Sequence, residues 1–131
     1  MKRRFMLDTN AVRLLLERSS PLLDQWFAQE RCSLSAIVAA EISYGLERQQ
    51  LSPARTTLVR ELLSVLPIEP FDLKVAATYG RLRAELQRAG RSLSAMDLLI
   101  ASHALALDRT LVSGDQAFQE VPELQLCSSV G

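Results

Sequence analysis

The stretch Phe5-Met6-Leu7-Asp8-Thr9-Asn10 (residues 5–10) decides the predicted fold. The apolar run at 5–7 has the character of a short buried strand, and each of the next three residues has a side chain that can cap the amino terminus of a helix. A helix is therefore expected from Ala11 to Leu16. A strand that passes directly into a helix is the first unit of an alternating α/β chain.

The same alternation continues to the end of the sequence. Further strands are predicted at Cys32–Leu34, Pro67–Glu69, Thr110–Val112 and Leu124–Leu126. Further helices are predicted to begin after Ser20, Ser35, Ser52, Asp72 and Ser94. Strands that alternate with helices form right-handed βαβ units with a mainly parallel sheet. We therefore expect one domain over residues 1–131, a three-layer α/β/α fold with a mainly parallel sheet of about five strands.

Composition supports one globular core and gives little information about partners. The 131 residues are 48% hydrophobic, which is enough for one sizeable core. Fifteen basic residues offset fifteen acidic ones, so RNA would have to be held by a local patch rather than by a global positive field. Cys32 and Cys127 have no C-x-x-C spacing, and we expect them to be buried thiols rather than metal ligands or a redox pair.

The start of the chain does not have the pattern of a targeting segment. Residues 1–4 are basic, but the apolar run that follows is too short for the hydrophobic region of a signal peptide. No apolar run approaches the length that spans a bilayer. The expected location is the reducing cytoplasm.

Four carboxylates, distant from one another in the sequence, form the candidate site. Asp8 and Asp115 each follow a predicted strand, and in parallel sheets binding sites form beyond the carboxyl ends of the strands. Glu41 shares a helix face with apolar neighbours, and Asp97 lies near the start of a helix that is apolar nearly all round. The fold could bring all four together.

Each acid also has a structural alternative. Asp8 can simply cap the first helix. Asp97 follows Ser94 by three residues, which is the spacing of a capping box. Asp115 lies in a turn, where exposed aspartates are common. Glu41 is harder to explain in this way, because a carboxylate within an apolar stripe needs a partner.

Convergence would make the four acids a cation site. Like charges about 4 Å apart repel by roughly 4 kcal/mol at an effective dielectric constant near 20, so the cluster must take up protons or a cation. Oxygen ligands select Mg²⁺ or Mn²⁺ over zinc, and such an ion can activate a water against a phosphorus atom. Thr9, Asn10 and Ser113 would orient carboxylates and waters by hydrogen bonds, or serve only as cap and turn residues.

Four segments, in their order and spacing, resemble PIN-domain ribonucleases across nearly the whole chain. They are Met6–Asn10, Ala40–Gly45, Asp97–Ala104 and Leu111–Phe118. The length and the lack of further domains resemble the VapC toxins of bacterial type II toxin-antitoxin systems. The resemblance implies a Mg²⁺- or Mn²⁺-dependent endoribonuclease, usually a homodimer, that cuts a transfer RNA or a ribosomal RNA loop. It also implies a VapB-like antitoxin whose C-terminal segment wraps the toxin and blocks its site.

The resemblance assigns Asp8, Glu41, Asp97 and Asp115 as the catalytic and metal-binding quartet. Two departures bear on the fourth acid. Gly114 stands where many relatives carry a polar residue, and Ser113 stands where threonine is common.

Contacts with RNA and protein partners are predicted more broadly. The cations available for RNA are Lys2, Arg3 and Arg4, together with Arg81, Arg83, Arg88 and Arg91, although a solvated helix face also explains the second group. His103 lies about 240° around the helix from Asp97 and is predicted to be a packing residue. Trp26, Phe27 and the apolar residues of 36–66 could form a groove for an antitoxin helix, a dimer contact or ordinary core.

Two other functions remain open at this stage. A binding or regulatory module could use the same scaffold without turnover. A phosphatase-like hydrolase would need a nucleophilic aspartate with a nearby lysine, for which the chain offers only Lys2 and Lys74.

Overall fold

A computed structural model describes residues 2–130 and contains a five-stranded parallel sheet. The strands are β1 (Phe5–Leu7), β2 (Cys32–Ser35), β3 (Ile68–Glu69), β4 (Thr110–Val112) and β5 (Leu126–Cys127). Their order across the sheet is β3-β2-β1-β4-β5, and all four neighbouring pairs are parallel. The predicted parallel sheet is confirmed.

Six α-helices connect the strands. They are α1 (Thr9–Leu16), α2 (Pro21–Ala28), α3 (Ala36–Arg48), α4 (Pro53–Val65), α5 (Leu73–Arg88) and α6 (Ala95–Ala106). The predicted caps Ser20, Ser35, Ser52, Asp72 and Ser94 all accept a hydrogen bond from the first turn of their helix. Gly90, just after α5, has φ +71°, the left-handed conformation that glycine commonly adopts at the end of a helix. Within residues 2–130, no helix has the length and apolarity needed to cross a bilayer.

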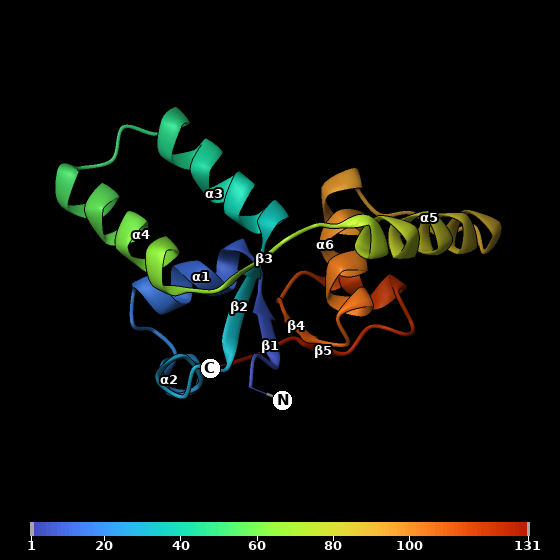
Figure 1. The fold of residues 1–131 in the computed structure, drawn as a ribbon, viewed down its shortest axis with the longest axis horizontal. Coiled ribbons are helices and arrows are strands. Elements are labelled where there is room, and N and C mark those ends of the chain that lie inside the picture. Colours follow the sequence, from blue (N-terminus) through green and yellow to red (C-terminus); the bar gives the residue numbers. More distant parts are fainter. Residues whose placement is uncertain (1, 131) are drawn as a thin grey trace.

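The helices cover the sheet on both sides, which confirms the predicted three layers. Figure 1 shows α1, α2 and α4 on one side of the strands and α5 and α6 on the other. Helix α3 leaves the carboxyl end of β2 and contacts both α1 and α6. Leu7, Leu34 and Leu111 in the central strands are at most 1% exposed, so the core lies along the sheet.

The segment after β4 differs from the prediction. A short 3₁₀ helix, η1 (Gln116–Glu120), follows the predicted turn in a region for which no element was predicted, and it buries Phe118. The last strand begins at Leu126, two residues later than predicted. Leu124 is buried, but its N–H donates to the carbonyl of Val121 and therefore belongs to a turn rather than to the ladder. Apolar character marked a buried residue there, and the hydrogen bonding decided the strand boundary.

Candidate active site

The register of the two central strands brings Asp8 next to Ser113. Leu7 of β1 pairs with Val112 of β4, so the residues that follow them leave the same edge of the sheet side by side. The N–H of Asp8 continues the ladder by donating to the carbonyl of Val112 at 3.2 Å. Asp115 lies two residues farther on, at the start of η1.

Helices α3 and α6 bring the other two acids to this edge. Helix α3 begins directly after β2, and Glu41 lies in its second turn. Helix α6 runs back against the strands before β4, so its amino terminus lies at the carboxyl edge of the sheet. Asp97 is in the first turn of that helix.

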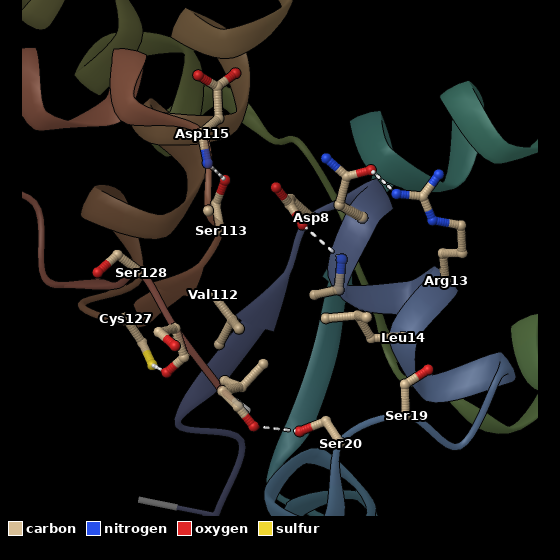
Figure 2. A pocket seen from close by; sticks show the side chains of 15 residues that line it. Asp8, Arg13, Leu14, Ser19, Ser20, Val112, Ser113, Asp115, Cys127 and Ser128 are labelled. Carbon is tan, nitrogen blue, oxygen red and sulfur yellow. Dashed lines mark hydrogen bonds between the residues drawn. The ribbon is translucent and has the colours of Figure 1, made fainter.

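All four acids line one small cavity. We call it the acidic cavity: about 140 Å³, lined by Asp8, Thr9, Asn10, Glu41, Asp97, Ile100, Asp115 and Phe118. Four elements, α1, α3, α6 and η1, contribute to it together with the junction residues Asp8 and Asp115, and the two apolar side chains come from α6 and η1. A larger cavity of about 650 Å³ adjoins it and shares Asp8, Asn10 and Asp115 (Figure 2).

The acids at the strand ends also serve the local structure. Oδ1 of Asp8 accepts the N–H of Ala11 at 2.8 Å and caps α1, and this residue is only 7% exposed. Oδ1 of Asp115 accepts the N–H of Ala117 at 3.0 Å and caps η1. The capping alternative is therefore real for both residues. It uses one oxygen of each carboxylate.

The acids on the helices have no such structural partner. Across residues 2–130, the carboxylates of Glu41 and Asp97 accept no hydrogen bond, and none of the four acids is in an ion pair. Ser94 caps α6 by accepting the N–H of Asp97 at 3.1 Å. The carboxylate of Asp97 does not return the bond, so the predicted capping-box alternative does not account for its side chain.

The acids repel one another in the absence of a cation. Burial raises the pKa of Asp8, and the charge of Asp115 adds to the rise, while hydrogen bonds from Ser113, Ala11 and Asn10 oppose it. Burial also raises the pKa of Glu41, followed by the charges of Asp97 and Asp8. Burial is the larger cause of both raised pKa values, and the negative charges of neighbouring acids add to it.

The donor set suits a hard divalent cation. Every charged group of the acidic cavity is a carboxylate, with hydroxyl and amide oxygens beside them from Thr9 and Asn10. Within residues 2–130, however, no three His, Cys, Asp or Glu side chains are close enough together to form a ready-made metal centre. Like charges at short range repel, so a closer approach of these carboxylates would require a cation to offset their charge.

The predicted orienting residues lie where this chemistry needs them. Thr9 and Asn10 line the acidic cavity, and Ser113 contributes a hydrogen bond that lowers the pKa of Asp8. Oγ of Ser113 also accepts the N–H of Asp115 at 3.1 Å, so it links two of the acids. Their function as orienting groups remains a prediction.

The structure does not gather the predicted RNA-binding cations around the acidic cavity. Lys2 pairs with Glu30 at 3.5 Å, and Arg3 pairs with Glu69 at 3.6 Å. Arg4 donates to the carbonyl of Asp108 at 3.3 Å. On α5, Arg81 pairs with Glu85 and Glu123, and Arg83 donates to the hydroxyl of Tyr79. RNA contact by these residues remains a prediction.

Other reactive side chains are accounted for by packing. His103 is fully buried, as predicted, with its Nδ1 2.7 Å from Oγ of Ser35, and burial lowers its pKa. Cys32 is buried, which raises the pKa of its thiol to about 11. Cys127 is only partly buried, so the expectation that both thiols are buried was wrong for the second. Cys127 lies on the short edge strand β5, where one side of the chain has no neighbour.

Arg13 is a candidate that the sequence analysis did not single out. Its guanidinium donates to Oδ1 of Asn10 at 3.0 Å, in the larger cavity that adjoins the acids. The signal was its position three residues after Asn10, which places both on one face of α1.

Comparisons with known proteins agree with this fold. Residues 5–124 match the model of the PIN domain family. A protein named ribonuclease VapC2 from Rickettsia felis is 33% identical over 93% of this chain and 95% of its own length. A protein from Shigella flexneri named tRNA(fMet)-specific endonuclease VapC is 27% identical, with the same coverage. A crystal structure of DNA-bound VapBC from Salmonella typhimurium matches with a TM-score of 0.84 and 29% identity, over 95% of this chain and 96% of that one.

A parallel sheet with acids at its carboxyl edge defines an α/β protein with a candidate active site there. The chain belongs to the PIN domain family and, within it, to the VapC group.

Proposed function

We propose that this protein is a Mg²⁺- or Mn²⁺-dependent endoribonuclease that acts as the toxin of a toxin-antitoxin pair. One observation carries the proposal: four carboxylates from distant parts of the chain line one cavity, and none of them is neutralised by a basic side chain among residues 2–130. A structural set of acids would be paired, because burying unpaired charge is costly.

Asp8, Glu41, Asp97 and Asp115 would hold the ion. When bound, it would make a water more acidic and offset the charge that develops on the phosphate oxygens. The cap on α1 fixes one oxygen of Asp8, which leaves the other available to the cavity. The carboxylate of Glu41 accepts no hydrogen bond from the described residues, so both of its oxygens are available to the ion.

The substrate class follows from the relatives. The curated relatives are named ribonucleases, and the one from Shigella flexneri is named for the initiator transfer RNA. We therefore propose a transfer RNA as substrate, with ribosomal RNA as the alternative.

The cleavage test compares the parent protein with Asp8→Asn on structured RNA, with and without Mg²⁺ or Mn²⁺. Asparagine caps helices as well as aspartate does, so this variant keeps α1 and removes only the charge. We expect metal-dependent cleavage by the parent and none by the variant. Glu47→Gln, on the same helix as Glu41 but exposed and outside the acidic cavity, is the control that should cleave normally.

Two outcomes would favour other functions. Equal cleavage by the parent and Asp8→Asn would show that the quartet is not the catalytic centre. Metal binding by the folded protein without cleavage of any RNA tested would favour a regulatory binding module.

An antitoxin is the proposed partner, and the structure offers it an apolar groove. This groove, of about 640 Å³, lies between α1, α2 and α4 and includes Leu15, Phe27, Leu58, Leu62 and Val65. Leu58 and Val65 are 43% and 62% exposed, which is costly unless an apolar partner covers them. Trp26 does not contribute, because it stacks on Phe5 with ring centroids 3.7 Å apart. An amphipathic helix of a VapB-like antitoxin fits this groove.

The partner is tested by co-expression with the antitoxin. Leu58→Asp should abolish co-purification and leave RNA cleavage intact, whereas Leu73→Asp, at a residue that is 85% exposed on α5, should leave co-purification unchanged. Retention of the antitoxin by Leu58→Asp would place its binding site elsewhere. Homodimerisation, also expected for the group, is measured independently by light scattering on the protein alone.

A further inference from the structure

A larger cavity adjoins the acidic cavity, and segments distant in the sequence, near the two ends of the chain, line it. We call this 650 Å³ hollow the polar groove. Asn10, Arg13 and Leu14 of α1 line it, and so do Gly114, Ser128 and Ser129 from the segments around β4 and β5. Figure 2 shows Arg13 and Leu14 on one side of Asp8 and Ser128 on the other. Because Asp8, Asn10 and Asp115 line both hollows, anything held in the groove reaches the acids directly.

The last residues of the described chain build the far wall. The hydroxyl of Ser20, at the start of α2, donates to the carbonyl of Val130, and Val130 is only 8% exposed. The thiol of Cys127 donates to the carbonyl of Ser129 at 3.4 Å. The bond from Ser20 and the pairing of Cys127 with Val112 of β4 anchor the two ends of the segment 127–130.

Arg13 supplies the positive charge that a phosphate needs beside an acidic cavity. The side chain is exposed, its only hydrogen bond within residues 2–130 goes to Oδ1 of Asn10, and no carboxylate there pairs with it. A guanidinium has five N–H donors, so several remain for a ligand. Four nearby carboxylates would repel a polyanion, and a cation at this position would offset the repulsion locally.

Gly114 keeps the opposite wall low. A Cβ at this position would meet only the carbonyl oxygen of Ser128, at 3.7 Å, which is ordinary contact. Gly114 also has no left-handed backbone that would demand glycine. A variant with a larger side chain at position 114 should therefore fold normally, with that side chain at the edge of the groove.

We propose that the polar groove holds the single-stranded RNA next to the bond that is cut, with Arg13 as a positioning residue that binds a flanking phosphate. This proposal rests on the proposed ribonuclease function. The volume of the polar groove, about 650 Å³, lies within the range of sites for small ligands. The lining residues of the groove include hydroxyls, one cation and apolar side chains, together with the carboxylates of Asp8 and Asp115 that it shares with the acidic cavity, but no aromatic ring. The groove would therefore bind the RNA backbone rather than stack bases.

The experiment measures RNA binding without cleavage. In the Asp8→Asn background, the affinity for a labelled single-stranded RNA on the order of ten nucleotides long is measured over a range of salt concentrations. Adding Arg13→Gln should weaken binding roughly tenfold and reduce the slope of log affinity against log salt by about 0.7, the value for one lost phosphate contact. Arg13→Lys should restore the slope. Arg60→Gln, the same charge change on the exposed face of α4, should alter neither.

A thiol at the groove reports occupancy directly. Cys127 lines the groove and is partly exposed, whereas Cys32 is buried and its raised pKa keeps it protonated and unreactive. RNA should slow alkylation of Cys127 in Asp8→Asn, and the protection should be lost at the same RNA concentration when Arg13→Gln is added. Ser128→Asp, which puts a negative charge on the far wall, should also weaken RNA binding.

The outcomes separate this proposal from the proposed function. If the parent cleaves RNA but Arg13→Gln binds RNA with the same affinity and slope as Arg60→Gln, the groove assignment is wrong and the nuclease stands. Unprotected Cys127 in a complex that binds RNA would also overturn it. If Cys127 is instead protected only by the antitoxin, the groove is a protein-binding site.

Discussion

Two sets of acids in this molecule differ in that only one of them is paired with basic side chains. Glu69 of β3, whose side chain is 13% exposed, pairs with Arg109 at 3.3 Å and with Arg3 at 3.6 Å. In the acidic cavity, Asp8 is about as buried, yet neither it nor its three carboxylate neighbours meets a basic side chain among the described residues. The charge of Glu69 is neutralised within the folded chain, whereas the charges of the four acids in the cavity would have to be neutralised by a bound cation or by protons.

The difference separates a structural role from a functional one. An acid that is neutralised internally contributes to stability, and its loss leaves a buried cation unpaired. Acids that repel one another lower stability in the apo protein, and a fold retains them only where the binding of a cation offsets the cost. Substitution of an acid in the cavity should therefore change cleavage and Mg²⁺-dependent stability. Substitution of Glu69 should change only the stability that does not depend on Mg²⁺.

The largest expected effect is on catalysis. Asp97→Asn should reduce RNA cleavage by roughly 10³-fold, because a ligand of a metal that supplies several kcal/mol of transition-state stabilisation is lost. Its carboxylate makes no hydrogen bond within residues 2–130, so the fold should be unaffected. Glu69→Gln should cleave at the parent rate. Cleavage rates under single-turnover conditions decide this, and a cleavage-deficient Glu69→Gln would erase the distinction between the two sets.

The next effect is metal-dependent stability. Mg²⁺ at about 100 times its dissociation constant should stabilise the parent by roughly 2.7 kcal/mol, since it binds only the folded state. Asp97→Asn should lose most of this gain, and Glu69→Gln should keep it. Thermal unfolding with Mg²⁺ and with EDTA measures the gain. Ca²⁺ is a useful comparison, because its larger coordination shell tests how tightly the four acids can close.

Substitution of Glu69, the acid that is paired with arginines, should change stability by a similar amount, but independently of Mg²⁺. Glu69→Gln should lower the free energy of unfolding by about 2 kcal/mol in the presence or absence of Mg²⁺, because the guanidinium of Arg109, 15% exposed, would keep no carboxylate partner. Chemical denaturation gives the value. Glu30→Gln is the matched control, since its pair with Lys2 is mostly exposed and should contribute less than 1 kcal/mol.

The helices and strands that carry these acids could be predicted from the sequence more accurately than the side chains that the acids contact. Capping residues and apolar runs are local signals, so five helix starts and the parallel sheet could be predicted from them. The convergence of Asp8 and Asp115 follows from strand register, which alternation alone implies only in outline. The pairing of Glu69 with Arg109 joins residues 40 positions apart through long side chains and had no local signal.

The same reasoning explains what was missed at the site. Arg13 was assigned no role because the sequence does not show that residues 127–130 return to face α1 and create a groove there. No element was predicted for residues 116–120, because a 3₁₀ segment is too short to show helical periodicity. The first omission concerns a surface assembled from segments distant in the chain, and the second concerns a local element that leaves no periodic pattern.

The smallest expected effect is the pH dependence of the apo protein. The pKa of Glu41 is raised in the folded state by burial and by Asp97 and Asp8, so between its unfolded and folded pKa values the native state binds more protons. Stability from this group is therefore lost as the pH rises through that window. Glu41→Gln cannot ionise, so in EDTA its melting temperature relative to the parent should rise between pH 4 and pH 7. Saturating Mg²⁺ at neutral pH should reverse the order, because the parent alone then gains a full set of ligands. A relative melting temperature that does not change with pH would mean that the acids do not repel one another, and the contrast with Glu69 would lose its physical basis.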